Sequence, residues 1–114
     1  MNGIKALSLE ETLDVIAASE TGRAKEVHGA TYASHNEGFG VLCEEIQEMM
    51  DEARCLKHYA DHLCRYVRAD DAAGMADALV AMRKTAIRAA AEAVQVAAVC
   101  GKWMEGLDHA EDES

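Results

Sequence analysis

The strongest constraint on this chain is a helical pattern of apolar residues that continues without interruption over residues 37–67. Apolar side chains recur there at intervals of three and four residues, at Phe39, Leu42, Ile46, Met49, Ala53, Leu56, Ala60, Leu63 and Val67. This spacing places them on one face of a long α-helix. The 114-residue sequence contains no proline, the residue that most strongly breaks a helix, so nothing prevents helices of this length.

Shorter signals predict two further helices. Ser8 and Glu11 form a capping-box pattern, which predicts a helix from Leu9 through residue 25. Ser34 is a candidate cap for the long second helix, and a third helix is expected over residues 75–104, with Gly106 as its end. Residues 28–34 and 68–74 are expected to be a loop and a break, and the acidic residues 108–114 a disordered tail.

These elements predict an all-α fold in a single domain, residues 1–107. We expect a helical bundle of two long antiparallel helices plus a shorter N-terminal helix. A domain of this size buries only a modest core, and two long amphipathic helices carry more apolar surface than one hairpin covers. The bundle is therefore expected to be completed by oligomerisation, as a homodimer or a dimer of dimers.

The charge of the chain excludes some partners. Asp and Glu number 21 against 11 Lys and Arg, a formal net charge of −10, which argues against binding a nucleic acid polymer or an anionic membrane surface. No segment has the apolar length of a signal peptide or a membrane span. Four cysteines lie on predicted helices without a disulfide-framework pattern, so a cytoplasmic location is expected.

Carboxylates on two predicted helices are the main candidates for chemistry. Glu45, Glu48 and Glu52 fall within roughly 60° of one another on the second helix. Glu92 lies in a mostly apolar run, residues 86–100, which also contains Arg88, and Gln95 follows Glu92 at the same spacing of three that separates Glu45 from Glu48. Two such pairs on facing helices can converge on a hard cation such as Mg²⁺, which prefers oxygen ligands.

Two simpler interpretations stay open. Acidic clusters on helices are commonly solvated faces with no ligand. Glu92 can instead form an ion pair with Arg88, one helical turn earlier.

The order of these residues resembles a known family. Glu44, Glu45 and Glu48 match the motif Glu-Glu-x-x-Glu, and Glu92 begins a later Glu-x-x-Asp in which Gln95 replaces the aspartate. His28-Gly29 and the stretch Ser34-His35-Asn36-Glu37-Gly38-Phe39 precede the glutamates. The chain thus resembles the MazG-like, all-α nucleoside triphosphate pyrophosphohydrolases, and most closely their small phage and prophage members.

The resemblance implies a function and assigns roles to residues. It implies hydrolysis of a nucleoside triphosphate to the monophosphate and pyrophosphate, dependent on Mg²⁺, or alternatively on Mn²⁺. Glu45, Glu48 and Glu92 would be metal ligands and catalytic, Gln95 would be the fourth ligand, and Glu44 an accessory one. A neutral Gln95 should weaken metal binding, so the alternative is a non-catalytic phage or prophage accessory or regulatory protein that keeps the bundle.

Basic residues are candidates for substrate binding. Lys84 and Arg88 precede Glu92 on the third helix, and Lys102 projects from a face similar to that of Gln95; each can contact phosphates. His35 can contact a base or a sugar. The simpler interpretation is that the cations balance the acidic second helix and that His35 only begins it.

Cys55, His58 and His62 form a separate cluster within about 60° of one helix face. Thiol and imidazole groups suit Zn²⁺, so a zinc-binding helical module is a third hypothesis. A pair of surface histidines beside half-buried cysteines is the alternative.

Overall fold

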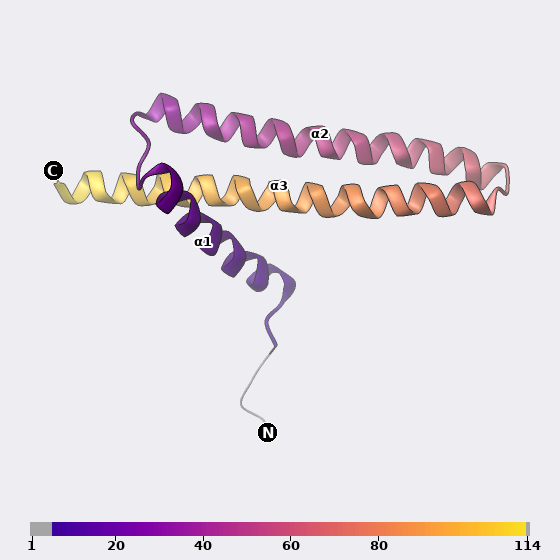
Figure 1. Cartoon of the computed structure of the whole chain (residues 1–114), viewed down its shortest axis with the longest axis horizontal. Helices are drawn as coiled ribbons and strands as arrows, with labels where there is room; N and C mark the ends of the chain where they lie inside the picture. The colour runs from indigo at the N-terminus through magenta and orange to yellow at the C-terminus, as the bar shows by residue number, and fades with distance from the viewer. Residues whose placement is uncertain (1–5, 114) are drawn as a thin grey trace, which may run out of the picture. The chain divides into compact units, whose positions relative to one another are not determined.

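The computed structural model describes residues 6–113, with side chains through residue 108, and in that range it contains three α-helices and no strand. In chain order these are α1 (Leu9–His28), α2 (His35–Arg68) and α3 (Ala72–Glu113), as Figure 1 shows. The prediction of an all-α fold is confirmed.

The helices contribute to two compact units. The terminal unit contains residues up to Cys43 and residues from Val94 onward, and the central unit is Glu44–Ala93. The terminal unit therefore holds α1 and one end each of α2 and α3, whereas the central unit holds the remaining parts of α2 and α3.

Serine caps begin the first two helices as predicted. The Ser8 hydroxyl accepts the backbone N–H of Glu11, and the Glu11 carboxylate accepts the Ser8 N–H, which completes a capping box. Ser34 accepts the Glu37 N–H in the same way at the start of α2, and the Glu37 carboxylate accepts the N–H of Ala33. These bonds satisfy N–H groups that the first turn of a helix leaves unpaired.

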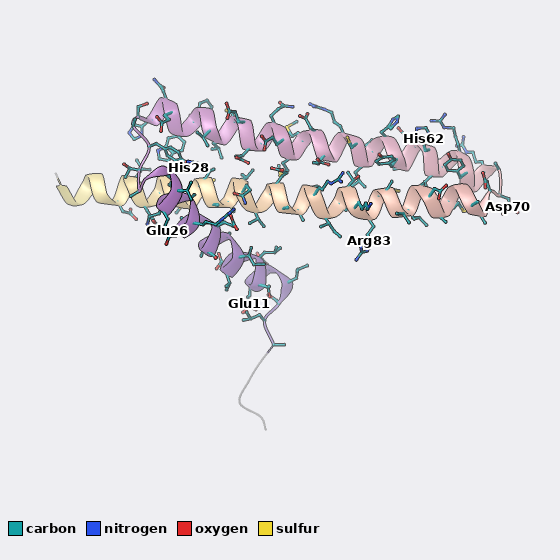
Figure 2. The ribbon with its side chains drawn as sticks, viewed as in Figure 1. Glu11, Glu26, His28, His62, Asp70 and Arg83 are labelled. Carbon is teal, nitrogen blue, oxygen red and sulfur yellow. The ribbon has the colours of Figure 1, made fainter. Side chains whose placement is uncertain are left out.

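The turn between α2 and α3 is a Schellman motif built on an aspartate. Asp70 adopts a positive φ of 52°, and Figure 2 shows it at the turn. Its N–H donates to the Val67 carbonyl, and the N–H of Asp71 donates to the Tyr66 carbonyl. The Asp71 side chain then accepts the Gly74 N–H. Helix α3 accordingly begins at Ala72, three residues before the predicted start.

The far end of α3 was predicted wrongly. The helix does not end near Met104 and Gly106 but continues to Glu113. Residues 108–113, expected in a disordered tail, have helical backbone, while Ser114 lies outside the described residues. A glycine inside a helix costs only about 1 kcal/mol, and no proline follows to stop the helix.

Close contact between α1 and α3 organises the terminal unit. The buried Thr21 hydroxyl lies 3.1 Å from the carbonyl oxygens of both Ala17 and Ala98. A Cβ added at Gly101 would lie 2.8 Å from the Thr21 Oγ1, so the two backbones need glycine there. An ion pair between Lys25 and Glu105 adds to this contact.

Burial within the described residues falls mainly on small side chains. Ala78 and Ala98 are the buried apolar residues, and Thr21, Thr85 and Lys102 are the buried polar ones. Larger apolar residues of the central unit stay exposed, among them Leu79 at 53%, Val80 at 61% and Ile87 at 55%. None of the helices, over the residues described, has the length and hydropathy needed to cross a membrane.

Gly74 is expected to be required for packing in the central unit. A Cβ at this position would lie 2.3 Å from Cδ1 and 2.7 Å from Cγ of Tyr66. We expect Gly74→Ala to lower the free energy of unfolding by about 1–3 kcal/mol through overpacking, despite the better helix propensity of alanine. Gly40→Ala is the control, because nothing lies within 4 Å of its added Cβ; it should stabilise by up to about 1 kcal/mol. Urea unfolding followed by circular dichroism measures both, and a stabilised Gly74→Ala would contradict the packing.

Candidate functional site

Three carboxylates meet in the central unit. One carboxylate oxygen from each of Glu45, Glu48 and Glu92 lies within 4.8 Å of the other two. Glu45 and Glu92 are half-buried, and Glu48 is exposed. Helix α2 supplies two of them one turn apart and α3 supplies the third, so residues more than 40 positions apart in sequence share one site. We refer to these three residues as the carboxylate cluster.

The cluster resists full ionisation. Desolvation raises the pKa of Glu45, and the charges of Glu48, Glu92 and Glu44 raise it further. The pKa of Glu92 is also raised, mainly by desolvation. A hydrogen bond with Glu48 and the charges of Glu48 and Glu52 raise it further. A carboxyl group with a raised pKa keeps its proton at a higher pH than an ordinary glutamate does. The same crowding favours a cation, which would relieve the repulsion.

The ion pair between Glu92 and Arg88, the simpler interpretation of Glu92, is not observed among the described residues. Arg88 and Lys84 are both exposed on α3, and neither makes an ion pair with any residue that the structure describes. Arg88 lies one helical turn before Glu92 in the sequence of α3. Glu44 is exposed and acts on Glu45 through its charge.

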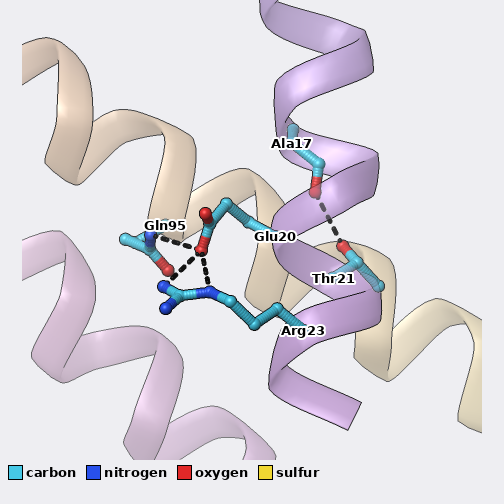
Figure 3. A network of polar contacts seen from close by, with 5 residues as sticks. All are labelled: Ala17, Glu20, Thr21, Arg23 and Gln95. Carbon is cyan, nitrogen blue, oxygen red and sulfur yellow. Dashed lines mark hydrogen bonds and ion pairs between the residues drawn. The ribbon is translucent and has the colours of Figure 1, made fainter. Parts of the chain in front are cut away.

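Gln95 belongs to a polar network in the terminal unit. Its Nε2 donates to the Oε2 of Glu20, 3.2 Å away, and the same oxygen accepts from Arg23 on α1 (Figure 3). Arg23 and then Gln95 lower the pKa of Glu20. The amide group of Gln95, expected as a fourth ligand, thus uses its nitrogen to join α3 to α1.

Lys102 and His35 lie in an aromatic cluster of the terminal unit. Lys102 is 4% exposed, and its ammonium lies 4.2 Å from the centre of the Tyr32 ring. The indole N–H of Trp103 donates to Nδ1 of His35 at 3.3 Å, and the two rings stack. A Cβ at Gly38 would lie 3.1–3.2 Å from the Trp103 and Tyr32 rings, so glycine keeps the space that these rings occupy. Since Nδ1 of His35 accepts, its Nε2 carries the proton in the neutral form.

The proposed zinc cluster is only partly assembled. Nε2 of His58 and Nε2 of His62 lie 3.1 Å apart. Cys55 is exposed and its thiol is free. Within the described part of the chain, the carboxylate cluster is the one group of three or more such side chains close enough to share an ion, so Cys55 does not join the two histidines.

Sequence reasoning missed the partners of Gln95 and Lys102. Glu20 lies 75 residues from Gln95, and no local spacing links them. The i,i+3 spacing of Glu20 and Arg23 indicated at most a pair within α1. Tyr32 lies in a predicted loop. Loop residues have no helical periodicity, so the sequence contained no indication that Tyr32 contacts Lys102.

Comparisons of the chain with protein-family models, with curated proteins and with solved structures find no match. The resemblance to MazG-like enzymes therefore depends on the motif residues themselves.

Neutralising Glu92 should stabilise the metal-free protein. A carboxyl group whose pKa is raised by folding stabilises the fold while protonated, and that contribution is lost as the pH rises through the raised value. We expect Glu92→Gln to increase stability in chelator at neutral pH by roughly 0.5 kcal/mol, the size of one or two like-charge contacts. The gain should disappear near pH 4, where the carboxyl is protonated.

Asp14→Asn is the control, because Asp14 is an exposed helical acid that makes no side-chain hydrogen bond or ion pair with any residue the structure describes. It measures the general effect of reducing a net charge of −10. Thermal unfolding in chelator at the two pH values gives the comparison. An equal gain in both variants would show that Glu92 carries no repulsion of its own.

Proposed function

We propose that the protein is a Mg²⁺-dependent nucleoside triphosphate pyrophosphohydrolase of MazG-like type, active or weakly active. The observation that carries this proposal is the convergence of Glu45, Glu48 and Glu92 from two helices. Carboxylate oxygens are the ligands that Mg²⁺ and Mn²⁺ prefer, so the donor set fits the metal that the resemblance implies.

The chemistry is a hydrolysis at the α-phosphate. Water oxygen bonds to the α-phosphorus, and the bond to the bridging oxygen breaks, so that pyrophosphate leaves with the electron pair. The bound cation would supply charge neutralisation and activation of water. A carboxylate oxygen of the cluster that the cation leaves uncoordinated would accept the proton of that water.

Cations of the chain would hold the phosphates. With a net charge of −10, the protein repels a triphosphate unless metal ions or basic side chains bind the phosphates and neutralise their charge. Arg88 and Lys84 are exposed and without ion pairs among the described residues, which supports a role in binding phosphate. Lys102 and His35, also expected to contact the substrate, lie in the terminal unit, where Lys102 is buried over the Tyr32 ring and His35 accepts from Trp103; we therefore do not propose substrate contacts for them.

A second function is favoured by one observation. Position 95, where the resemblance expects an acid, holds an amide whose nitrogen donates to Glu20. That arrangement suits a helical accessory or regulatory protein in which the position has become a packing contact and catalysis has been lost.

The assembly and location belong to the same proposal. We propose that α2 and α3 run antiparallel and that a second copy, as a homodimer or a dimer of dimers, covers exposed apolar residues such as Leu79, Val80 and Ile87. The four cysteines are free thiols, which suits a reducing cytoplasm.

Pyrophosphate release from a panel of ribo- and deoxyribonucleoside triphosphates tests the function. With Mg²⁺ or Mn²⁺ we expect turnover by the wild type and a loss of about 100-fold or more in Glu48→Gln, comparable to removing one transition-state contact. Asp51→Asn is the control, because Asp51 is also an exposed acid on α2 but contacts Gln47 and Arg54. Equal turnover in Glu48→Gln and Asp51→Asn would exclude the cluster as the site.

Gln95→Asp separates the two functions. Gln95→Asp loses the N–H donor to Glu20 and places a second carboxylate beside that residue. In chelator it should therefore be less stable than Gln95→Asn. The asparagine is the control, because it shortens the side chain equally but keeps the amide. If position 95 binds metal, Mg²⁺ should reduce this difference in melting temperature and raise pyrophosphate release. A difference that is the same with and without Mg²⁺ would favour the non-catalytic protein.

A further inference from the structure

The two histidines on the second half of α2 have the geometry of a chelate. Nε2 of His58 and Nε2 of His62 are 3.1 Å apart, with ring centroids 4.5 Å apart and ring planes at 81°. Two imidazole nitrogens bound at about 2.1 Å to one cation of square-planar or octahedral geometry, at a right angle, are separated by about 3.0 Å. The observed distance therefore matches two adjacent positions of one coordination sphere.

We propose that His58 and His62 form a bidentate site for a divalent transition-metal ion of the Ni²⁺, Cu²⁺ and Zn²⁺ class. This site is distinct from the carboxylate cluster in its donor chemistry. Imidazole nitrogen suits these metals, whereas carboxylate oxygen suits Mg²⁺ and Mn²⁺. His58 is exposed and His62 is half-exposed at the surface of the helix, and Figure 2 labels His62 on α2.

The site needs little rearrangement to bind a cation. Residues at i and i+4 are neighbours on a helix, so the backbone already holds the two rings together. In the metal-free state the short distance is a hydrogen bond from one Nε2–H to the other Nε2. Binding requires both rings to be neutral with the proton on Nδ1, so that both Nε2 lone pairs face the ion.

The rest of the coordination sphere is open to water. Among the described residues no third His, Cys, Asp or Glu side chain comes close enough to share an ion with this pair. Asp61, on the same stretch of helix, is engaged by Lys57. The site is thus a two-imidazole chelate on one helix, without the closed ligand set of a structural zinc site.

Calorimetric titration with Ni²⁺, in the presence of saturating Mg²⁺, tests the assignment. We expect one Ni²⁺ per chain and a higher melting temperature with Ni²⁺, because the ion binds the folded helix better than the unfolded chain. His58→Gln and His62→Gln should each weaken binding by at least tenfold, since one imidazole replaces a chelate. Circular dichroism checks that both variants keep the helical fold.

Two controls make the result decisive. His28→Gln removes an equally exposed imidazole at the end of α1 and should leave Ni²⁺ binding unchanged. Cys55→Ser should also leave it unchanged, and a loss of affinity there would identify a thiol ligand and overturn the two-imidazole site. Two other results would overturn the two-imidazole site as well. One is a Ni²⁺ affinity of His62→Gln equal to that of the wild type, and the other is a loss of Ni²⁺ affinity in His28→Gln as large as in the His58 and His62 variants.

Discussion

Packing of side chains directly against helix backbone at small residues is the constraint on which the rest of this structure depends. In the terminal unit, Thr21 lies against Ala98 and above Gly101, and Gly38 lies against the Trp103 ring. In the central unit, Gly74 lies against the Tyr66 ring, so close that no Cβ would fit. Contacts of this kind place a side chain against the backbone of another segment but bury little apolar area. For that reason the buried apolar side chains of the described residues are alanines, and larger side chains such as Leu79 and Ile87 remain at the surface.

Such a thin core makes buried polar groups important to stability. Lys102 lies over the Tyr32 ring, and Thr21 bonds to a carbonyl on another helix. A buried polar group that lost its partner would cost about 1–3 kcal/mol, a large fraction of the stability of a small domain. The carboxylate cluster differs from these groups, because desolvation, and after it the neighbouring glutamates, raise the pKa values of Glu45 and Glu92.

The accuracy of each prediction from the sequence depends on how local its signal is. The caps at Ser8 and Ser34 and the helical spacing of α2 are local, and the structure agrees with them. The meeting of Glu45, Glu48 and Glu92 was predictable, because residue spacing places these carboxylates on faces of two helices that can converge. The Glu20–Gln95 contact was not, since it depends on how α1 crosses α3. The end of α3 was missed because Gly106 was read as a stop signal, although a glycine within a long helix is tolerated.

Helix α2 thus carries two sets of potential metal ligands of opposite preference. Glu45 and Glu48 offer oxygen, and His58 and His62 offer nitrogen. Ten residues separate Glu48 from His58 in the sequence, which corresponds to about 15 Å along a helix, so the two sets cannot share one ion. Mg²⁺ should bind to the oxygens and Ni²⁺ to the nitrogens. Zn²⁺ accepts both donor types, so stabilisation of this protein by Zn²⁺ alone would identify neither site, whereas the contrast between Mg²⁺ and Ni²⁺ assigns each ion to its own ligands.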